Sequence, residues 1–315
     1  MRSTRWLLIA ALTVGCSSSH GTTNGDMMGP MRPAGFNPPP LDPGETEYDS
    51  PIISQIPPGS DITYCSYLDA TIADETDVIH YRVFGSLTSH HAILYAAKQP
   101  KPVDTHVCTE DDMVNGRFLA GGGAEGVSAV TIPDGLAFRI PANTQLMIQT
   151  HWINATTSPV DGQAVAYITA VPSSPSRQTM DLFDVVNTSF TLPAGQVTTA
   201  TTTCTMQKDL NIFALAGHMH EFGQHFDYKV ADAGGANLQM LWSKDWAPEY
   251  QSAPPYTVYS EAQPLVLKAG QQVSVTCEWN NTTGNDIAFP REMCVGTSFY
   301  FPATDGEIDC INGHW

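Results

Sequence analysis

The sequence has few charged residues, and acidic residues outnumber basic ones. Only 15% of its 315 residues are charged, and 14 Lys and Arg stand against 32 Asp and Glu, which gives a formal net charge of −18. Removing a segment that contains Arg2 and Arg5 would bring this charge to about −20 (−18 − 2). An acidic protein repels phosphate backbones, so we expect no nucleic-acid partner.

Several common signatures of chemistry are also missing. The chain has no Cys-x-x-Cys pair, which argues against a zinc ribbon or a thioredoxin-like site. No Gly-x-Gly-x-x-Gly run opens a strand–helix unit, so a nicotinamide or flavin domain is not supported. No Gly-x-Ser-x-Gly elbow is present for a serine hydrolase.

The first residues have the pattern of an export signal. Met1–Cys16 begins with basic residues and continues into the apolar run Trp6–Leu12, which is too short to span a bilayer as a mature helix. Small residues before Cys16 resemble the lipobox of bacterial lipoproteins, although Thr13 departs from the usual aliphatic residue and leaves plain secretion open. We expect an exported envelope lipoprotein, lipidated at Cys16, and Ser17 favours the outer membrane.

The remaining chain divides into a tether and two domains of an all-β protein. Residues 17–46 are rich in Ser, Gly and Pro, which favours an extended, flexible tether. The segment Pro172–Ser176 is the best internal boundary, and it predicts β-domains at 47–175 and 178–315. Short runs of β-branched and aromatic residues indicate many strands, and we see no long helical period. The expected strands include 78–84, 89–95, 145–149, 164–168, 265–267 and 273–276.

The seven cysteines fit an exported protein. If Cys16 takes a lipid, six remain, and an even number in an exported chain suggests three disulfides. Six cysteines allow 15 pairings, so the residues alone do not decide among them.

The stretch Phe213–Phe226 organises the chemistry of the chain. Its apolar residues alternate with small ones, which predicts a strand on which His218 and His220 share one face and Met219 takes the other. Two imidazoles on one face can reach one metal ion, and imidazole suits Zn, Cu, Fe and Ni. Two half-buried histidines satisfied by hydrogen bonds would explain the same pattern.

Two further places offer metal ligands. His90 and His91 are adjacent in a strand-like run, so they can bind one ion only if the backbone bulges or twists there or if the two rings use different nitrogens. His151 ends the strand expected at 146–150 and would give a third imidazole. Met293 could add a soft thioether to His218 and His220, which favours Cu(I), although an isolated methionine is more often a core residue.

In combination these motifs resemble the copper type II, ascorbate-dependent monooxygenases. The resemblance rests on His90-His91, Gln149-Thr150-His151, His218-Met219-His220 and Glu292-Met293-Cys294, which follow in this order. It covers about Cys65 to Pro302. Any one motif is weak, but the four together are specific.

The resemblance implies two consecutive jelly-roll β-sandwich domains, each holding one copper ion, with a solvent-filled cleft between them. It implies that His90, His91 and His151 bind an electron-supplying copper, with Gln149 nearby. His218, His220 and Met293 would form the catalytic copper site, where a C–H bond is hydroxylated. The disulfides implied are Cys65–Cys108, Cys204–Cys310 and Cys277–Cys294.

We therefore expect a monomeric copper monooxygenase that acts on a small organic substrate with O2 and a reductant such as ascorbate. Peptide-amidating members grip the substrate carboxylate with an arginine, an asparagine and a tyrosine. Ala216, Val295 and Thr297 occupy those places here and cannot make a charge-assisted grip, so peptidylglycine is not the expected substrate. A non-catalytic copper-binding lipoprotein for storage or delivery is the alternative, and an ordinary ligand-binding β-sandwich is a third reading.

Overall fold

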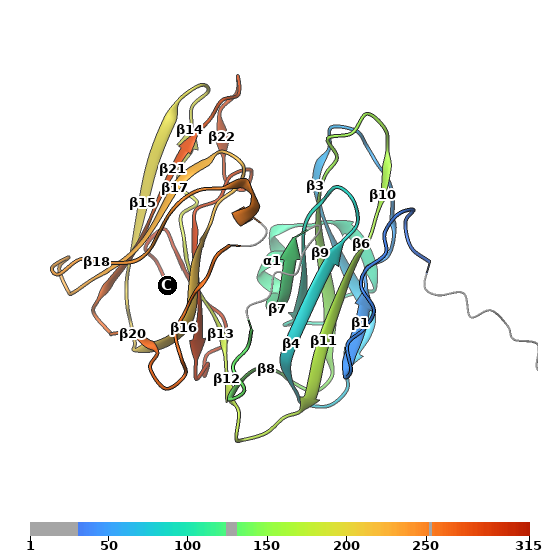
Figure 1. Cartoon of the computed structure of the whole chain (residues 1–315), viewed down its shortest axis with the longest axis horizontal. Helices are drawn as coiled ribbons and strands as arrows, with labels where there is room; N and C mark the ends of the chain where they lie inside the picture. Colours follow the sequence, from blue (N-terminus) through green and yellow to red (C-terminus); the bar gives the residue numbers. More distant parts are fainter. Residues whose placement is uncertain (1–30, 124–130, 252–253) are drawn as a thin grey trace, which may run out of the picture. The chain divides into compact units, whose positions relative to one another are not determined.

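The computed structural model describes residues 31–123, 131–251 and 254–315 of the chain, and this part is an all-β protein. Its one α-helix is the short α1 (Glu110–Asn115), and a 3₁₀ turn covers Pro248–Gln251. The prediction that the chain forms no long helix is therefore confirmed for the described residues. Figure 1 shows the strands of the N-terminal half in blue and green and those of the C-terminal half in yellow and red.

Two five-stranded sheets form the N-terminal half, with strand orders β1-β11-β4-β8-β12 and β6-β3-β9-β5-β7, and β10 pairs with β2 beside them. Pairing is antiparallel except between β12 and β8. The strands are β1 (Glu45–Asp49), β2 (Ile53–Ile56), β3 (Asp61–Ile72), β4 (Thr76–Gly85), β5 (Ser89–Ala97), β6 (Asp104–Val107), β7 (Gly116–Gly123), β8 (Leu136–Ile140), β9 (Thr144–Ile153), β10 (Val160–Gly162), β11 (Ala164–Pro172) and β12 (Gln178–Thr179).

The C-terminal half pairs a six-stranded sheet with a four-stranded one. The larger sheet has the order β19-β16-β23-β13-β24 with β20 beside β16, the smaller has β15-β21-β17-β18, and β14 pairs with β22. The strands are β13 (Asp181–Val186), β14 (Thr191–Leu192), β15 (Val197–Thr205), β16 (Leu210–His218), β17 (Gly223–Ala231), β18 (Gln239–Asp245), β19 (Thr257–Val258), β20 (Leu265–Leu267), β21 (Gln272–Asn280), β22 (Ile287–Ala288), β23 (Val295–Phe301) and β24 (Ile308–Ile311).

Alternation of buried and exposed residues explains why these segments form sheets with one face in a core. Along β21 every second residue is buried, from Val273 to Trp279, and these side chains pack with the inner face of the six-stranded sheet. In the N-terminal half, Leu94 of β5 and Phe138 of β8 belong to one core drawn from both five-stranded sheets. That core continues onto Phe213 and other residues of the outer face of the six-stranded sheet.

The prediction of a flexible tether at 17–46 is wrong for its last part, residues 32–46, which contacts the sheet. Arg32 forms ion pairs with Glu47 and Asp49, and Phe36 is buried in a small apolar cluster with residues of β4 and β11. The hydroxyl of Tyr167 donates to the carbonyl of Pro39 at 2.9 Å. Proline-rich composition suggested a solvated chain, but one phenylalanine and one arginine find partners on the sheet.

Other predictions about the N-terminus lie outside the described residues. These are the signal segment, the lipidated Cys16 and the first part of the tether. Among the residues that are described, no helix has the length and apolar character needed to cross a membrane.

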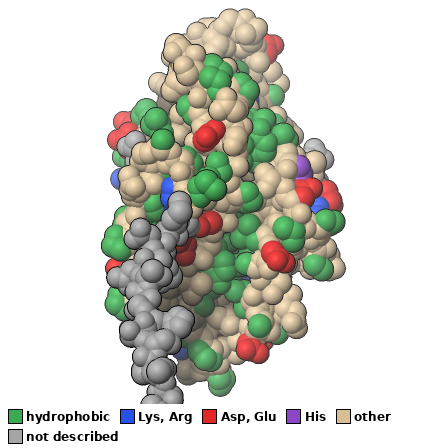
Figure 2. All heavy atoms as spheres, turned by 90° about the vertical axis from the view of Figure 1, so that its right-hand side faces the viewer, with side chains coloured by type: hydrophobic (Ala, Val, Ile, Leu, Met, Phe, Trp, Pro, Cys, Tyr) green, Lys and Arg blue, Asp and Glu red, His purple; other side chains and the backbone are tan. Residues whose placement is uncertain are grey.

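On the face in Figure 2, acidic side chains are scattered and only a few basic ones are visible.

The structure contains the three disulfides that the resemblance implies. Cys65–Cys108 ties β3 to the segment that follows β6, and Cys204–Cys310 ties β15 to β24. Cys277–Cys294 joins β21 to the residue before β23, which is also the residue after Met293. The segment carrying Met293 is thus fixed covalently to the neighbouring sheet.

Candidate metal centre

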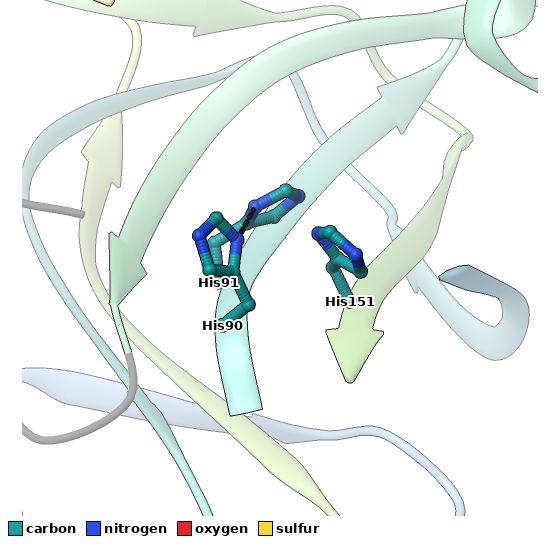
Figure 3. A group of neighbouring side chains, drawn as sticks. All are labelled: His90, His91 and His151. Carbon is teal, nitrogen blue, oxygen red and sulfur yellow. Dashed lines mark hydrogen bonds between the residues drawn. The ribbon is translucent and has the colours of Figure 1, made fainter. Parts of the chain in front are cut away.

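Three histidines of the N-terminal half lie together where β5 and β9 run side by side. His90, His91 and His151 each offer a ring nitrogen, and these three atoms lie within 4.8 Å of one another. Figure 3 shows the three rings gathered at the ends of the two strands. Their ring centroids are 4.7–5.2 Å apart.

A backbone irregularity makes this arrangement possible. The pairing of β5 with β9 shifts register between Ser89 and His91, so the regular alternation of side chains is broken there. The Nδ1 atoms of His90 and His91 consequently lie 3.0 Å apart. The bulge or twist expected from the sequence is confirmed. Two nitrogens each about 2.0 Å from one ion lie about 3 Å apart, so this spacing fits shared ligation.

Hydrogen bonds to the Nε2 atoms orient two of these rings. Nε2 of His91 lies 3.1 Å from Oε1 of Gln149, and Nε2 of His151 lies 2.6 Å from Oδ1 of Asp61. Nε2 donates its proton in each contact, so the neutral form of either ring keeps its lone pair on Nδ1. Partners of this kind orient histidine ligands in metal sites. Nε2 of His90 is buried without a hydrogen-bond partner.

Burial keeps the imidazoles neutral. It lowers the pKa of His90 to about 4, and the pKa of His91 is also lowered well below its ordinary value by burial and by the neighbouring His151. A neutral imidazole is the form that binds metal. At neutral pH His90 and His91 therefore present lone pairs and not positive charges.

A second set lies at the end of β16. His218 is the last residue of the strand, whereas His220 lies beyond it, so the single strand predicted for both residues ends one step early. Their ring centroids are nevertheless 5.1 Å apart. Met219 is fully buried in the core, as the alternation predicted.

The turn after β16 holds His220 from two sides. Its backbone N–H donates to the buried carboxylate of Glu292 at 3.1 Å, and its Nδ1–H donates to the carbonyl of Arg291 at 3.1 Å. Nε2 is left buried without a partner. Burial lowers the pKa of His220 to about 4, so this nitrogen is an unprotonated acceptor at neutral pH.

Strand register brings the segment that carries Met293 next to this set. Val295 opens β23 and pairs with His218, and the carbonyl of Arg291 and the carboxylate of Glu292 both contact His220. Cys294 is fully buried in the core, whereas Met293 and Val295 on either side of it are partly buried. Two imidazoles and a thioether form a donor set that suits Cu(I) better than zinc or magnesium.

The two sets touch each other. The ring centroid of His220 lies 5.6 Å from that of His90 and 6.5 Å from that of His151. This differs from the solvent-filled cleft that the resemblance implies between two separate sites. The physical reason is an ion pair between Asp61 and Arg291 beside the rings, together with the apolar packing of Phe118 and Phe138 against Phe299.

Three other histidines, each isolated in the sequence, lie beside carboxylates. His106 contacts Asp104 and Asp112, His225 contacts Asp227 and Asp245, and His80 lies 3.6 Å from Glu45. His20 lies outside the described residues, and His314 takes part in a turn at the C-terminus.

Sequence patterns assign no role to two acidic residues of the centre. Asp61 lies in no motif, and Glu292 enters its motif only as the residue before Met293, so only the fold places them against His151 and His220. A further group, Asp184, Glu307 and Asp309, brings three carboxylates within 4.8 Å of one another on β13 and near β24. Burial and the neighbouring Asp309 raise the pKa of Glu307 to about 7, which favours a shared proton over three full charges.

Comparisons with known proteins agree with the donor set. Residues 177–313 match the family model of the copper type II ascorbate-dependent monooxygenase, C-terminal domain. An all-β fold with a cluster of neutral histidines thus coincides with a copper-enzyme signature. This match lies in the C-terminal half of the chain and supports the family that the sequence motifs resemble.

The remaining comparisons add no argument. No curated protein matches the chain. Among solved structures, PNGase F, a glycosylasparaginase from Flavobacterium meningosepticum, is 12% identical, with 85% of this chain and 97% of that chain covered and a TM-score of 0.37. The major capsid protein P2 from bacteriophage PM2 is 9% identical, with coverages of 83% and 99% and a TM-score of 0.34. Nothing about function is drawn from either.

Proposed function

We propose that this protein is a copper-dependent monooxygenase that hydroxylates a C–H bond of a small organic substrate. The observation that carries the proposal is the gathering of five imidazoles into two adjoining sets. Met293 directly follows two residues that hydrogen-bond to His220. Hydrogen bonds hold one ring nitrogen of His91, His151 and His220, and burial lowers the pKa of His90 and His220 to about 4.

Each set would hold one copper ion, two per chain. His90, His91 and His151 would hold the ion that receives an electron from the reductant. His218, His220 and Met293 would hold the ion beside which the substrate is oxidised. Copper, when bound, would supply one-electron redox chemistry and the activation of O2.

The reaction balances with an external donor. One oxygen atom of O2 enters the substrate as a hydroxyl group, and the other leaves as water. Two electrons and two protons are needed, and a one-electron donor such as ascorbate supplies the electrons in two steps. The chain's own part is to hold and orient the ligands: Gln149 and Asp61 fix ring orientation in one set, and Glu292 fixes the turn that carries the other.

The residues near the second set favour a substrate without a carboxylate grip. Ala216 is buried in β16 and pairs with Thr297 of β23, and Val295 pairs with His218. Ala216 and Val295 have no side-chain donor, and the hydroxyl of Thr297 carries no charge, so these positions offer no cationic grip on a carboxylate. We therefore infer a small organic substrate other than a peptide with a terminal glycine.

We also propose that the protein has two jelly-roll domains, is a monomer, and is an exported lipoprotein anchored through Cys16. These features agree with the resemblance, and the three disulfides suit an oxidising compartment. Neither nucleic acid nor an organic cofactor is part of the proposal.

The test uses the full chain purified from its own cell envelope. We expect two copper ions per chain, and O2 uptake with ascorbate that rises with one member of a panel of small substrates. Met293→Ile should abolish this uptake, whereas Met240→Ile, at an exposed position on β18, should not. Fewer than two copper ions per natively folded chain would overturn the two-site proposal.

Copper storage or delivery is the second candidate, and the contact between the two sets favours it. Rings packed 5.6 Å apart can hold metal without leaving room for a substrate between them. If copper binds but no substrate raises O2 uptake, and Met293→Ile changes only copper affinity, the binding function replaces the enzymatic one.

A further inference from the structure

Asp61, the first residue of β3, contacts groups from both halves of the chain. Its Oδ1 atom lies 2.6 Å from Nε2 of His151, in the first histidine set. Its Oδ2 atom lies 3.3 Å from Nη1 of Arg291, two residues before Met293. One carboxylate therefore joins a histidine of the first set to the segment that supports the second.

Arg291 is in turn fixed against the second set. Its backbone carbonyl accepts the Nδ1–H of His220 at 3.1 Å, its guanidinium pairs with Glu221, and the same group lies over the ring of Phe222 at 5.6 Å. Displacing Arg291 must therefore disturb the turn that orients His220.

From this geometry we propose that Asp61 and Arg291 are a pair of positioning residues that couples the two histidine sets. The proposal rests on the proposed function, because coupling matters only if both sets hold metal. In metal sites the outer partner of a histidine fixes its ring and raises its basicity. Here the outer partner of His151 is the Asp61 carboxylate, the outer partner of His220 is the Arg291 carbonyl, and the two partners are ion-paired.

A purely stabilising role is the weaker explanation of this pair. The side chains of Asp61 and Arg291 are 34% and 41% exposed, and ion pairs at such positions contribute little to stability. The pair is distinguished by its further contacts, because Asp61 also contacts the ring of His151 and the Arg291 carbonyl contacts the ring of His220. The pair thus sets geometry at two places at once.

Three substitutions separate the steps of this coupling. Asp61→Ala removes the acceptor of His151 and the partner of Arg291 together. Asp61→Asn keeps an oxygen for His151 but removes the charge that attracts Arg291. Arg291→Gln removes the charge from the other side. Lys268→Gln is the matched control, because it breaks an exposed ion pair with Asp209 elsewhere in the C-terminal half.

The first readouts use the metal-free full chain with its disulfides intact. The ¹⁵N shifts of the His151 ring report its tautomer, and hydrogen exchange of the His220 and Phe222 amides reports the turn bonded to Glu292. We expect Asp61→Ala to abolish the single tautomer of His151 and to accelerate exchange at both amides. Asp61→Asn and Arg291→Gln should accelerate exchange while His151 keeps its tautomer, and Lys268→Gln should change neither.

The second readout is copper affinity, measured by competition with a chelator. Loss of an outer partner typically lowers metal affinity by about 10–100-fold, and we expect Asp61→Ala to have this effect on the first set. Asp61→Asn and Arg291→Gln should each weaken copper binding at the second set. The double variant Asp61→Asn/Arg291→Gln should be no weaker than either single variant, because both break one link.

The outcomes separate the two proposals. If copper binds but no Asp61 variant alters the His220 and Phe222 amides or the affinity of the second set, the coupling is wrong and the copper proposal stands. If the wild-type chain takes up no copper while the metal-free readouts respond as expected, the coupling stands and the proposed function fails. Asp61→Asn keeps the test open if Asp61→Ala does not fold.

Discussion

The imidazole rings of His90 and His220 lie with their centroids 5.6 Å apart, although one belongs to β5 and the other follows β16. Nε2 of each ring is buried without a hydrogen-bond partner. Buried polar atoms without partners are rare and require an explanation. A metal ion bound at Nε2 would supply the missing partner of His220, whereas His90 offers a metal ion either this atom or Nδ1.

The first prediction concerns acid stability of the metal-free protein. The pKa of both His90 and His220 is lowered by burial from the ordinary 6.5 to about 4, so the folded protein binds fewer protons than the unfolded chain between these values. Their contribution to stability is present above pH 6.5 and is lost as pH falls toward 4. The slope is at most about 1.4 kcal/mol per pH unit for each histidine. His90→Gln should flatten the curve of unfolding free energy against pH in this window.

A matched control has the opposite sign. Asp104 and Asp112 raise the pKa of His106, so its contribution is present at low pH and is lost as pH rises through the raised value. His106→Gln should therefore leave the acid limb between pH 6.5 and 4 at least as steep. Urea unfolding at closely spaced pH values measures both variants. A His90→Gln curve as steep as that of the wild type would contradict the assignment of His90.

The second prediction concerns the three carboxylates near β24. Because burial raises the pKa of Glu307 from 4.5 to about 7, the folded protein holds an extra proton between these values. Its effect on stability is most favourable below pH 4.5 and is lost as pH rises through 7. Glu307→Gln should consequently stabilise the protein at pH 8 relative to pH 4 by about 2–3 kcal/mol. Glu278→Gln on β21 is the control, and an equal gain there would show a general charge effect.

The third prediction concerns Glu292, whose carboxylate accepts the N–H groups of His220 and Phe222 and the Nε1–H of Trp279. Glu292→Gln replaces one acceptor oxygen with a donor and leaves a buried N–H unsatisfied. The expected loss is about 1–3 kcal/mol of unfolding free energy, with a broadened signal from His220. Denaturant unfolding and NMR of the histidine rings measure the two effects. An unchanged His220 signal would remove Glu292 from the support of the second set.

The fourth prediction concerns Gly217, which precedes His218. A Cβ atom at this position would lie 2.4 Å from Cδ1 of Phe226, a fully buried ring. Gly217→Ala should cost about 1–3 kcal/mol through overpacking and should lower copper binding at the second set. Gly284→Ala, where the added atom meets nothing within 4 Å, is the control. Equal stability of the two variants would contradict the close packing behind His218.

Sequence patterns predicted the parts of this protein that depend on local alternation. The strand that carries His218 and the separation of Met219 from that face follow from period-two reasoning. The same reasoning made an irregular backbone one of two conditions under which His90 and His91 could share an ion. The end of β16 could not be predicted in this way, because a carboxylate 72 residues away along the chain accepts the N–H of His220. Likewise, nothing local in the sequence places Asp61 beside His151.

The segment 32–46 shows the same limit. Its prolines indicated an extended chain, which is correct for the local conformation, but composition carries no information about which surface a chain will meet. Arg32 and Phe36 find their partners only after β1, β4 and β11 have formed a sheet. Tertiary contacts therefore decide where the ordered part begins.

The continuous packing between the two halves has a practical consequence. Phe213 and Phe299, on the outer face of the six-stranded sheet, are buried against side chains of the N-terminal half. A fragment restricted to residues 177–313, the part that carries the family signature, would expose these aromatic rings to water. Exposed apolar patches of this kind favour aggregation. Recombinant work on this protein should therefore begin near residue 32 and keep both halves in one polypeptide.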